Sequence, residues 1–289
     1  MLQNIIVHGL LNGGVYALLA VGFSLMFGVA RIVNLAFTAY YMLAAYFIYL
    51  FSVMSGVNPL LSIVLAIIIV STLGLGTYKI FIDPIREYHT TVIIITIAMA
   101  LVFQEAIQMF FGSQYRGLPP LLEGYFTVMN ARVTYQYVLT FTVVIVILAI
   151  VWLILMKTKI GLDIRATAQD REVANLMGID TNHIAVMTMF ITIILACIAG
   201  AMVAPLFVVE PHMWMHPIVI ILAAVVLGGM GSIKGSFIGA FILAFAEVSV
   251  VFMVPMGSYF KGAVALAIMV IVLLTKPEGL FGITIEGER

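Results

Sequence analysis

Residues 217–254 decide how this chain folds, and they read PIVIILAAVVL, then GGMGSIKG, then SFIGAFILAFAEVSVVFMV. The first 11 residues are apolar, but as a helix they rise only about 17 Å, roughly half of a hydrocarbon core. The next eight residues hold Gly228, Gly229, Gly231 and Gly235, which favour a tight structural turn because they lack a side chain. The last 19 residues are long enough to cross a bilayer. We therefore predict a half-helix that enters the membrane, a glycine turn and a full helix that returns.

The composition of the whole chain indicates a membrane protein. Of its 289 residues, 64% are hydrophobic and only 9% are charged, whereas soluble domains are about half apolar and a quarter charged. The formal net charge is zero and there is no basic block, so nothing in the sequence favours nucleic acid as a partner. The first 30 residues carry no charged side chain and lack the basic region of a signal peptide, so we expect the first apolar segment to remain as a spanning helix.

Charges, prolines and glycines divide the rest of the chain into segments of roughly the 20 apolar residues that a spanning helix needs. The expected segments are residues 5–30, 33–53, 60–82, 90–111, 134–156, 184–203 and 257–275. We predict an all-α membrane protein in which residues 1–289 form a single transmembrane domain, with about eight membrane passages, one of them a re-entrant half-helix. Non-helical backbone at membrane depth requires cover from protein or a water-filled cavity, which favours a transport pathway over a passive anchor.

Lys and Arg near the segment ends predict the orientation, because cytoplasmic loops of membrane proteins carry an excess of both. If residues 157–182 are cytoplasmic, ten of the 13 Lys and Arg residues face the cytoplasm and three face outside. The ten are Arg31, Lys79, Arg86, Lys157, Lys159, Arg165, Arg171, Lys234, Lys276 and Arg289, and the three are Arg116, Arg132 and Lys261. The N-terminus is then outside and the C-terminus is cytoplasmic.

Residues 157–180 read KTKIGLDIRATAQDREVANLMGID and hold eight of the chain's 26 charged residues between two long apolar segments. We expect Gly161 and Gly178 to break helices in this charged loop. Asp170 is a good N-cap for a short helix, and Glu172 is favourable near the positive end of its dipole. Gly178 suits the position that ends this helix.

The short helix, expected over residues 171–177, places Val173, Leu176 and Met177 on one face at positions i, i+3 and i+4. A helix of this length is too short to be stable alone in water, so its apolar face must be buried against something. One alternative is that it lies on its own protein or on the lipid surface. The other is that it forms a protruding peg that docks into the groove of a soluble partner.

Several stretches resemble one family of transport proteins. Residues 172–178, EVANLMG, look like the E-A-A-x-x-x-G loop of ABC importer permeases, with Val at the second position. More specifically, nearly the whole chain resembles the LivH-type permease subunits of branched-chain amino acid ABC importers. The stretches that carry this resemblance are GLLxGxxYAL (9–18), FG (27–28), VNLA (33–36), GLDIRAxAQD (161–170), AxLMGID (174–180), LGGxGSIxG (227–235) and KPxGLFG (276–282).

This resemblance implies a subunit of a bacterial or archaeal cytoplasmic (inner) membrane that pairs with a second, homologous permease in membrane lipid. Two cytoplasmic ATP-binding subunits would engage residues 157–182 as a coupling loop, and an external or periplasmic substrate-binding protein would deliver the cargo. The implied coupling residues are Arg165, Asp170, Arg171, Glu172, Val173, Ala174, Leu176, Met177 and Gly178. The chain itself would be non-catalytic and hold no cofactor, because the partner subunits would bind ATP and Mg; the sequence contains no Walker-type loop.

Polar residues within the apolar segments are candidates for a translocation pathway, because an ionisable group at a helix centre costs at least about 2.5 kcal/mol. Glu105, toward the external half of its segment, would attract a substrate ammonium; an interhelical hydrogen bond or a protonated buried acid is an equal alternative. For Glu247 we favour this second alternative, an interhelical hydrogen bond or a protonated buried acid. The candidate pathway residues are Asn12, Asn34, Thr38, Thr96, Gln104 and Glu105, although hydroxyls in membrane helices often bond their own backbone.

Two questions stay open at the level of sequence. After VNLA the family pattern usually continues with a small or His residue, Gly and an acid, whereas this chain has FTAY at residues 37–40. The substrate is therefore open between branched-chain amino acids, other amino acids, urea and short amides. A self-sufficient secondary transporter is the alternative from another class, since it also uses broken helices.

His212 and His216 are spaced i and i+4 with no acidic base between them, so we predict no metal site.

Overall fold

The computed structural model describes residues 2–128, 131–276 and 278–281. Three residues used above, Pro277, Gly282 and Arg289, lie outside these ranges. Within the described residues, eight helices are long and apolar enough to cross a membrane. The prediction of an all-α membrane protein is therefore confirmed.

The membrane helices follow the predicted segments closely. They are α1 (Leu2–Ala30), α2 (Phe37–Tyr49), α3 (Pro59–Thr77), α4 (His89–Phe111), α5 (Tyr135–Lys157), α8 (Thr181–Val203), α10 (Ile233–Met253) and α11 (Lys261–Thr275). Short irregular helices extend three of them: η1 (Leu50–Met54) follows α2, η2 (Tyr78–Ile82) and η3 (Asp83–Ile85) follow α3, and η4 (Gly257–Phe260) precedes α11. With these extensions, the observed ends lie within four residues of the predicted ones.

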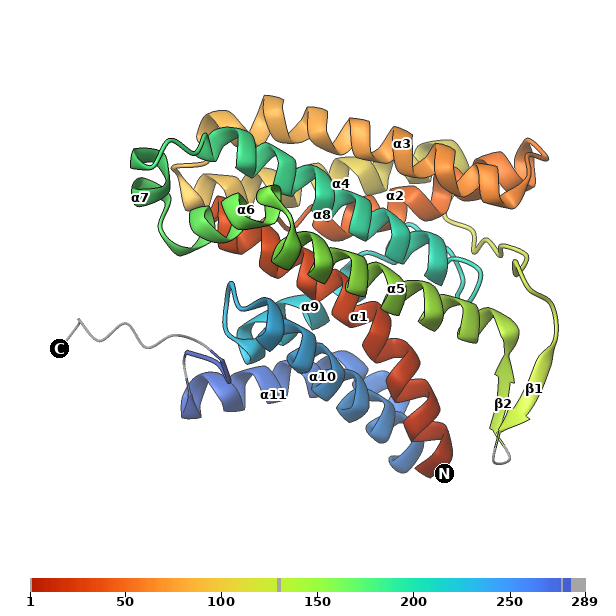
Figure 1. The fold of residues 1–289 in the computed structure, drawn as a ribbon. Coiled ribbons are helices and arrows are strands. Elements are labelled where there is room, and N and C mark those ends of the chain that lie inside the picture. The colour runs from red at the N-terminus through yellow and green to blue at the C-terminus, as the bar shows by residue number, and fades with distance from the viewer. Residues whose placement is uncertain (1, 129–130, 277, 282–289) are drawn as a thin grey trace.

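Helix α1 is the centre of the bundle and packs against α5, α8, α9 and α10 (Figure 1). Its contact with α10 depends on two glycines one helical turn apart. A Cβ atom added to Gly9 would lie 2.5 Å from the Phe245 ring, and one added to Gly13 would lie 2.5 Å from the Phe241 ring. Small residues at this spacing let membrane helices approach closely, so the two phenylalanine rings fit directly against the α1 backbone.

The interrupted region forms the half-helix α9 (Met215–Gly228), whose 14 residues rise only about 21 Å, and then the long helix α10. Between them, Gly229 and Gly231 have φ values of +98° and +85°, a conformation that favours glycine. Helix α10 begins at Ile233, three residues earlier than predicted, because the Ser232 hydroxyl accepts a hydrogen bond from the Gly235 N–H at 3.2 Å and caps it.

Residues 280 and 281, which follow α11, form hydrogen bonds with the end of the half-helix α9. The Leu280 N–H donates to the Leu227 carbonyl at 2.8 Å, and the Phe281 N–H donates to the Gly228 carbonyl at 3.1 Å. These carbonyls belong to the last turn of α9, where a helix leaves its acceptors without internal partners. The segment after α11 therefore supplies hydrogen bonds that a helix end inside a membrane protein requires.

The polar connection after α4 contains structure that we did not predict. Strands β1 (Tyr125–Val128) and β2 (Ala131–Thr134) form an antiparallel hairpin in which Tyr125 pairs with Thr134. An isolated bridge between Arg116 and Val209 joins this connection to the segment before α9. The hairpin and the first turn of α1 lie at one end of the bundle, and α7 (Arg171–Leu176) lies at the other (Figure 1).

We predict that Gly235→Ala separates α9 from α10. The added Cβ would lie 2.0 Å from the Gly228 carbonyl oxygen, and overpacking of this kind typically costs about 1–3 kcal/mol. The thermal unfolding midpoint of the detergent-purified protein should fall accordingly. Gly262→Ala in α11 is the matched control, because no atom lies within 4 Å of its added Cβ. Equal midpoints for the two variants would contradict the prediction.

Candidate functional site

The charged loop folds into two helices at one end of the bundle, α6 (Lys159–Gln169) and α7 (Figure 1). Thr158 caps α6 by accepting a hydrogen bond from the Gly161 N–H at 3.0 Å. The prediction that Gly161 breaks a helix is wrong, since it lies in the first turn of α6. A Cβ atom there would lie 2.2 Å from the Ile154 carbonyl oxygen. Glycine is needed at this position because α6 packs on the end of α5.

Helix α7 has the ends that the sequence predicts. The Asp170 carboxylate accepts hydrogen bonds from the Glu172 and Val173 N–H groups at 2.9 and 3.0 Å, so Asp170 is the N-cap. The helix ends at Leu176, and Gly178 follows with a φ of +87°, the conformation expected of a glycine that terminates a helix. Both ends of this short helix are therefore fixed by local interactions.

The apolar face of α7 is open to the surroundings. Ala174 is buried beneath the helix, whereas Val173, Leu176 and Met177 are 53%, 87% and 78% exposed. Most of this face therefore does not pack on its own protein, while the other half of that alternative, packing on the lipid surface, stays a prediction. A groove of about 630 Å³ runs between α6 and α7, and Val173 and Met177 belong to its lining. Arg165 lies on α6, and its Nε donates to the Gly161 carbonyl at 3.3 Å.

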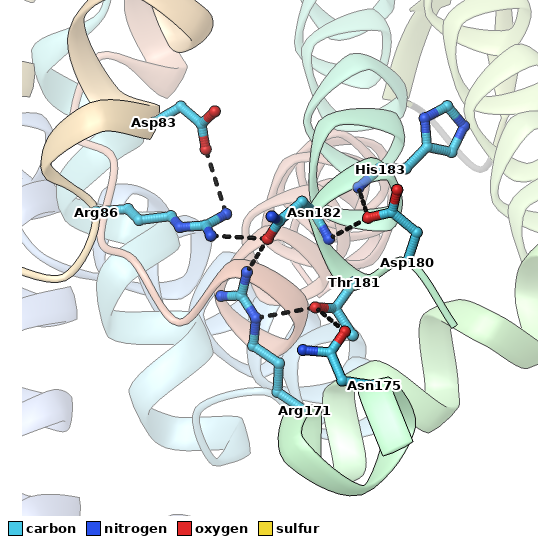
Figure 2. Close-up of polar contacts among 8 residues, drawn as sticks. All are labelled: Asp83, Arg86, Arg171, Asn175, Asp180, Thr181, Asn182 and His183. Carbon is cyan, nitrogen blue, oxygen red and sulfur yellow. Dashed lines mark hydrogen bonds and ion pairs between the residues drawn. The ribbon is translucent and has the colours of Figure 1, made fainter. Parts of the chain in front are cut away.

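A polar network behind α7 ties the loop to the rest of the protein (Figure 2). Arg171 donates from Nη2 to the Asn182 amide oxygen at 2.9 Å and from Nε to the Thr181 hydroxyl at 3.3 Å. Arg86, in the turn between α3 and α4, donates to the same Asn182 oxygen at 2.7 Å. Arg86 also forms an ion pair with Asp83 at 3.3 Å. The Asn182 amide oxygen, at the start of α8, thus joins the turn between α3 and α4 to helix α7.

The two guanidinium groups of this network are close enough to repel each other. Burial lowers the pKa of Arg171 from its ordinary value, and the Arg86 charge lowers it further, while Asp83 and Glu87 act in the opposite direction. Arginine nevertheless stays protonated in proteins. The shared acceptor Asn182 and the nearby carboxylates therefore stabilise two like charges beside the coupling loop.

A cavity of about 360 Å³ lies in the other half of the bundle, between α1, α9 and the start of α11. Its polar lining residues are Asn12, Tyr16, Tyr41, Glu210, His216 and Lys261. A smaller cavity of about 150 Å³ shares Asn12, Phe207 and Lys261 with the first and adds Glu247. The two cavities therefore meet beside Asn12, and one or both of them are lined by the side chains of His8, Glu210, His216, Glu247 and Lys261.

Of the predicted pathway residues, the structure brings only Asn12 to these cavities. The Asn34 side chain accepts a hydrogen bond from the Ala36 N–H at 3.0 Å, and Thr38 is buried. Thr96 accepts a hydrogen bond from the Leu35 N–H at 3.2 Å. These three side chains therefore stabilise the non-helical residues 31–36 or pack beside them.

Gln104 and Glu105 lie apart from both cavities on α4. Gln104 is buried and accepts a hydrogen bond from the Trp214 indole N–H at 2.9 Å. Glu105 is exposed and forms part of neither lining. Glu247 makes the interhelical hydrogen bond that we favoured, from the Tyr16 hydroxyl at 3.0 Å, and it also lines the smaller cavity. The residues around Glu247 in the sequence did not indicate that it lines a cavity.

Comparison with known proteins places this arrangement in a family. The family described as "Branched-chain amino acid transport system / permease component" matches residues 5–273. The chain belongs to this permease family. The resemblance to LivH-type permeases is therefore confirmed over nearly the whole length of the chain.

Individual members of the permease family extend the comparison. The chain is 30% identical to the high-affinity branched-chain amino acid transport system permease protein BraD of Pseudomonas aeruginosa, over 96% of this chain and 94% of BraD. It is 27% identical to the permease protein LivH of Escherichia coli, over 95% and 94% of the two chains. A solved structure, "PsaBC from Streptococcus pneumoniae in complex with Fab", shares the fold with a TM-score of 0.53 at 14% identity, over 96% and 94% of the chains.

In this permease, we predict that Asp170→Ala loosens α7 without unfolding the bundle. The variant loses both hydrogen bonds of the N-cap, which typically contribute about 0.5–2 kcal/mol. Hydrogen exchange of the amides in residues 171–176 should become faster, while the membrane helices keep their protection. Asp170→Asn is the control, because asparagine caps helices as well as aspartate does. Unchanged exchange in the alanine variant would refute the capping role.

Proposed function

We propose that this permease component is the transmembrane subunit of an ATP-binding-cassette importer for branched-chain, hydrophobic amino acids. It forms the translocation pathway with a second, homologous permease. Two cytoplasmic ATP-binding subunits bind ATP and Mg and carry out hydrolysis, and an external substrate-binding protein delivers the amino acid. In this arrangement the N-terminus lies outside and the C-terminus lies in the cytoplasm.

The observation that carries the proposal is the exposed apolar face of α7. Leu176 and Met177 are more than three quarters exposed, and a six-residue helix has little stability of its own. Large apolar side chains on a well-fixed helix at the end of a membrane bundle are suited to the groove of a soluble partner. In an importer of this family the ATP-binding subunit would supply that groove.

Helix α8 provides a route from this docking surface to the cavity. Its first residues, Thr181 and Asn182, accept hydrogen bonds from Arg171 at the base of α7. Its last residue, Val203, lines the larger cavity. The side chain of Asp180 caps α8 by accepting from the Asn182 and His183 N–H groups at 3.1 and 3.0 Å. A displacement of α7 therefore acts on the end of a helix that reaches the pathway.

Helix α1 provides a second route. Arg31, directly after α1, donates from Nη2 to the Ala168 carbonyl of α6 at 3.2 Å. In its other half, α1 contributes Asn12 and Tyr16 to the cavity. Movement of the two ATP-binding subunits would thus move α6 and α7 and, through α1 and α8, rock the walls of the cavity. Rigid-body motion of this kind is how many transporters alternate access to a site.

The distribution of charge supports the proposed orientation. Arg86 and Arg171 cluster behind α7, whereas Arg116 belongs to the connection that carries the hairpin at the opposite end of the bundle. Positive residues are concentrated on the cytoplasmic side of membrane proteins. This distribution supports the proposal that α7 lies on the cytoplasmic side, where ATP is available.

We predict that Leu176→Asp prevents the ATP-binding subunits from driving transport. A fully buried leucine contributes about 1.5–3 kcal/mol, so their binding should weaken by about 10- to 100-fold. The measurements are copurification of the complex and ATP-dependent uptake of labelled leucine into proteoliposomes. Leu176→Met, which keeps the apolar volume, is the matched control and should retain both.

Two outcomes would count against the proposed function. Normal copurification together with normal uptake in Leu176→Asp would remove α7 from the coupling mechanism. Leucine uptake by the permease alone, in proteoliposomes without ATP-binding subunits, would instead identify a self-sufficient secondary transporter. Competition of labelled leucine against urea and other amino acids in the complete complex tests the substrate class.

A further inference from the structure

A buried carboxylate stands at the junction of four helices beside the smaller cavity. Glu247 of α10 is only 2% exposed, and its Oε2 accepts a hydrogen bond from the Tyr16 hydroxyl of α1 at 3.0 Å. Its Oε1 lies 3.4 Å from Nε2 of His216, on α9, and 3.9 Å from Nζ of Lys261, on α11. Four of the helices that line the two cavities, α1, α9, α10 and α11, therefore contribute to the cluster.

The two oxygens of Glu247 are not equally satisfied. Among the residues that the structure describes, Oε1 accepts no hydrogen bond. The nearest nitrogen atoms of His216 and Lys261 are 3.4 and 3.9 Å away, farther than in a charge-assisted hydrogen bond, which is typically about 2.7–2.9 Å long. Burying a carboxylate without close partners is unfavourable. If the Glu247–Lys261 pair served only to hold α10 to α11, we would expect its N–O distance to be that of a charge-assisted hydrogen bond rather than 3.9 Å. Oε1 therefore has acceptor capacity that the protein itself does not use.

The cavities place complementary chemistry around this oxygen. Glu247 lines the smaller cavity, His216 lines the larger one, and Lys261 lines both. The side chains of His216 and Lys261 are partly exposed, at 44% and 37%, so the His216 imidazole and the Lys261 ammonium are accessible to a ligand. The wall of the larger cavity next to them is apolar and consists of Val15, Leu19, Val203 and Met213.

We propose that this cluster is the point in the pathway that recognises the charged groups of a zwitterionic amino acid. Glu247 Oε1 accepts hydrogen bonds from the substrate ammonium, and Lys261, assisted by His216, donates to the substrate carboxylate. The aliphatic side chain lies against the apolar wall of the larger cavity. This inference rests on the proposed function and adds to it the residues that select the substrate class.

The charge balance explains why a zwitterion fits. Without substrate, Glu247 and Lys261 form a loose pair of opposite charges. A zwitterion between them replaces one pair of opposite charges by two, so no net charge enters a region of low dielectric constant. A neutral amide or urea lacks both charges and would leave the pair as it is. The site therefore discriminates by the presence of an ammonium and a carboxylate on one molecule.

The test measures leucine uptake per ATP hydrolysed by the complete complex in proteoliposomes, with saturating binding protein. For Glu247→Gln we expect this ratio to fall about 10- to 100-fold, the range for losing one hydrogen bond to a charged group. ATP hydrolysis and copurification of the subunits should persist, because α7 is untouched. Glu123→Gln is the matched control, since that carboxylate is exposed in the connection after α4 and lines neither cavity.

A double variant separates recognition from a structural ion pair. Glu247→Gln together with Lys261→Met removes both members of the Glu247–Lys261 pair, so neither is left without the other, and the double variant should fold even if the single variant does not. If the pair were only structural, this double variant would restore the normal ratio of uptake to ATP hydrolysis, and our inference would be overturned. We expect the ratio to stay low. A normal ratio in Glu247→Gln alone would overturn the inference as well.

A third variant tests which acid receives the ammonium. Glu210 also lines the larger cavity, and a larger loss in Glu210→Gln than in Glu247→Gln would transfer the role to Glu210 and overturn our assignment. Leucine uptake by the wild-type complex distinguishes failure of this inference from failure of the proposed function. If it shows no ATP-dependent leucine uptake, the proposed function is wrong; if it does and Glu247→Gln matches it, only the present inference is wrong.

Discussion

Direct backbone contact between Gly228 and Gly235 is the constraint on which the rest of this structure depends. A Cβ on either glycine would lie within about 2 Å of the other's backbone atoms, so α9 and α10 meet with no side chain between their ends. A second close approach, of Gly239 to the Ala224 carbonyl, continues the contact along both helices. The half-helix is thereby held inside the bundle, and His216 at its start is brought beside Glu247 of α10.

The same turn also lies beside the end of α1 and beside α6 of the charged loop. A Cβ on Gly28 would lie 3.7 Å from the Gly231 carbonyl and 3.8 Å from the Ala168 side chain of α6. Arg31 follows with a φ of +56°, a conformation that is uncommon for a residue with a side chain. The end of α1, the glycine turn and α6 of the charged loop therefore lie together.

The sequence predicts the features that depend on near neighbours. Asp170, Gly178 and the glycine turn all act within a few residues, and the structure has Asp170, Gly178, Gly229 and Gly231 as expected. The prediction that Gly228 and Gly235 belong to the turn is wrong, because Gly228 ends α9 and Gly235 lies in the first turn of α10. Gly161 was misjudged because its conformation is ordinary and its requirement comes from contact with Ile154 of α5. Similarly, the importance of Glu247 depends on Tyr16, which is 231 residues away in the chain. Contacts between distant segments leave no local pattern in a single sequence.

Glu105 and Glu247 show why position within a segment is a weak guide to function in a membrane protein. Both are single acids in apolar helices, and Glu105 was the stronger candidate for a substrate contact because it lies toward the external half of α4. The structure leaves Glu105 exposed on α4 and buries Glu247 in the bundle. Burying a carboxylate in a region of low dielectric constant is unfavourable unless opposite charges accompany it. The convergence of Lys261 and His216 on Glu247 therefore distinguishes the two acids better than depth does.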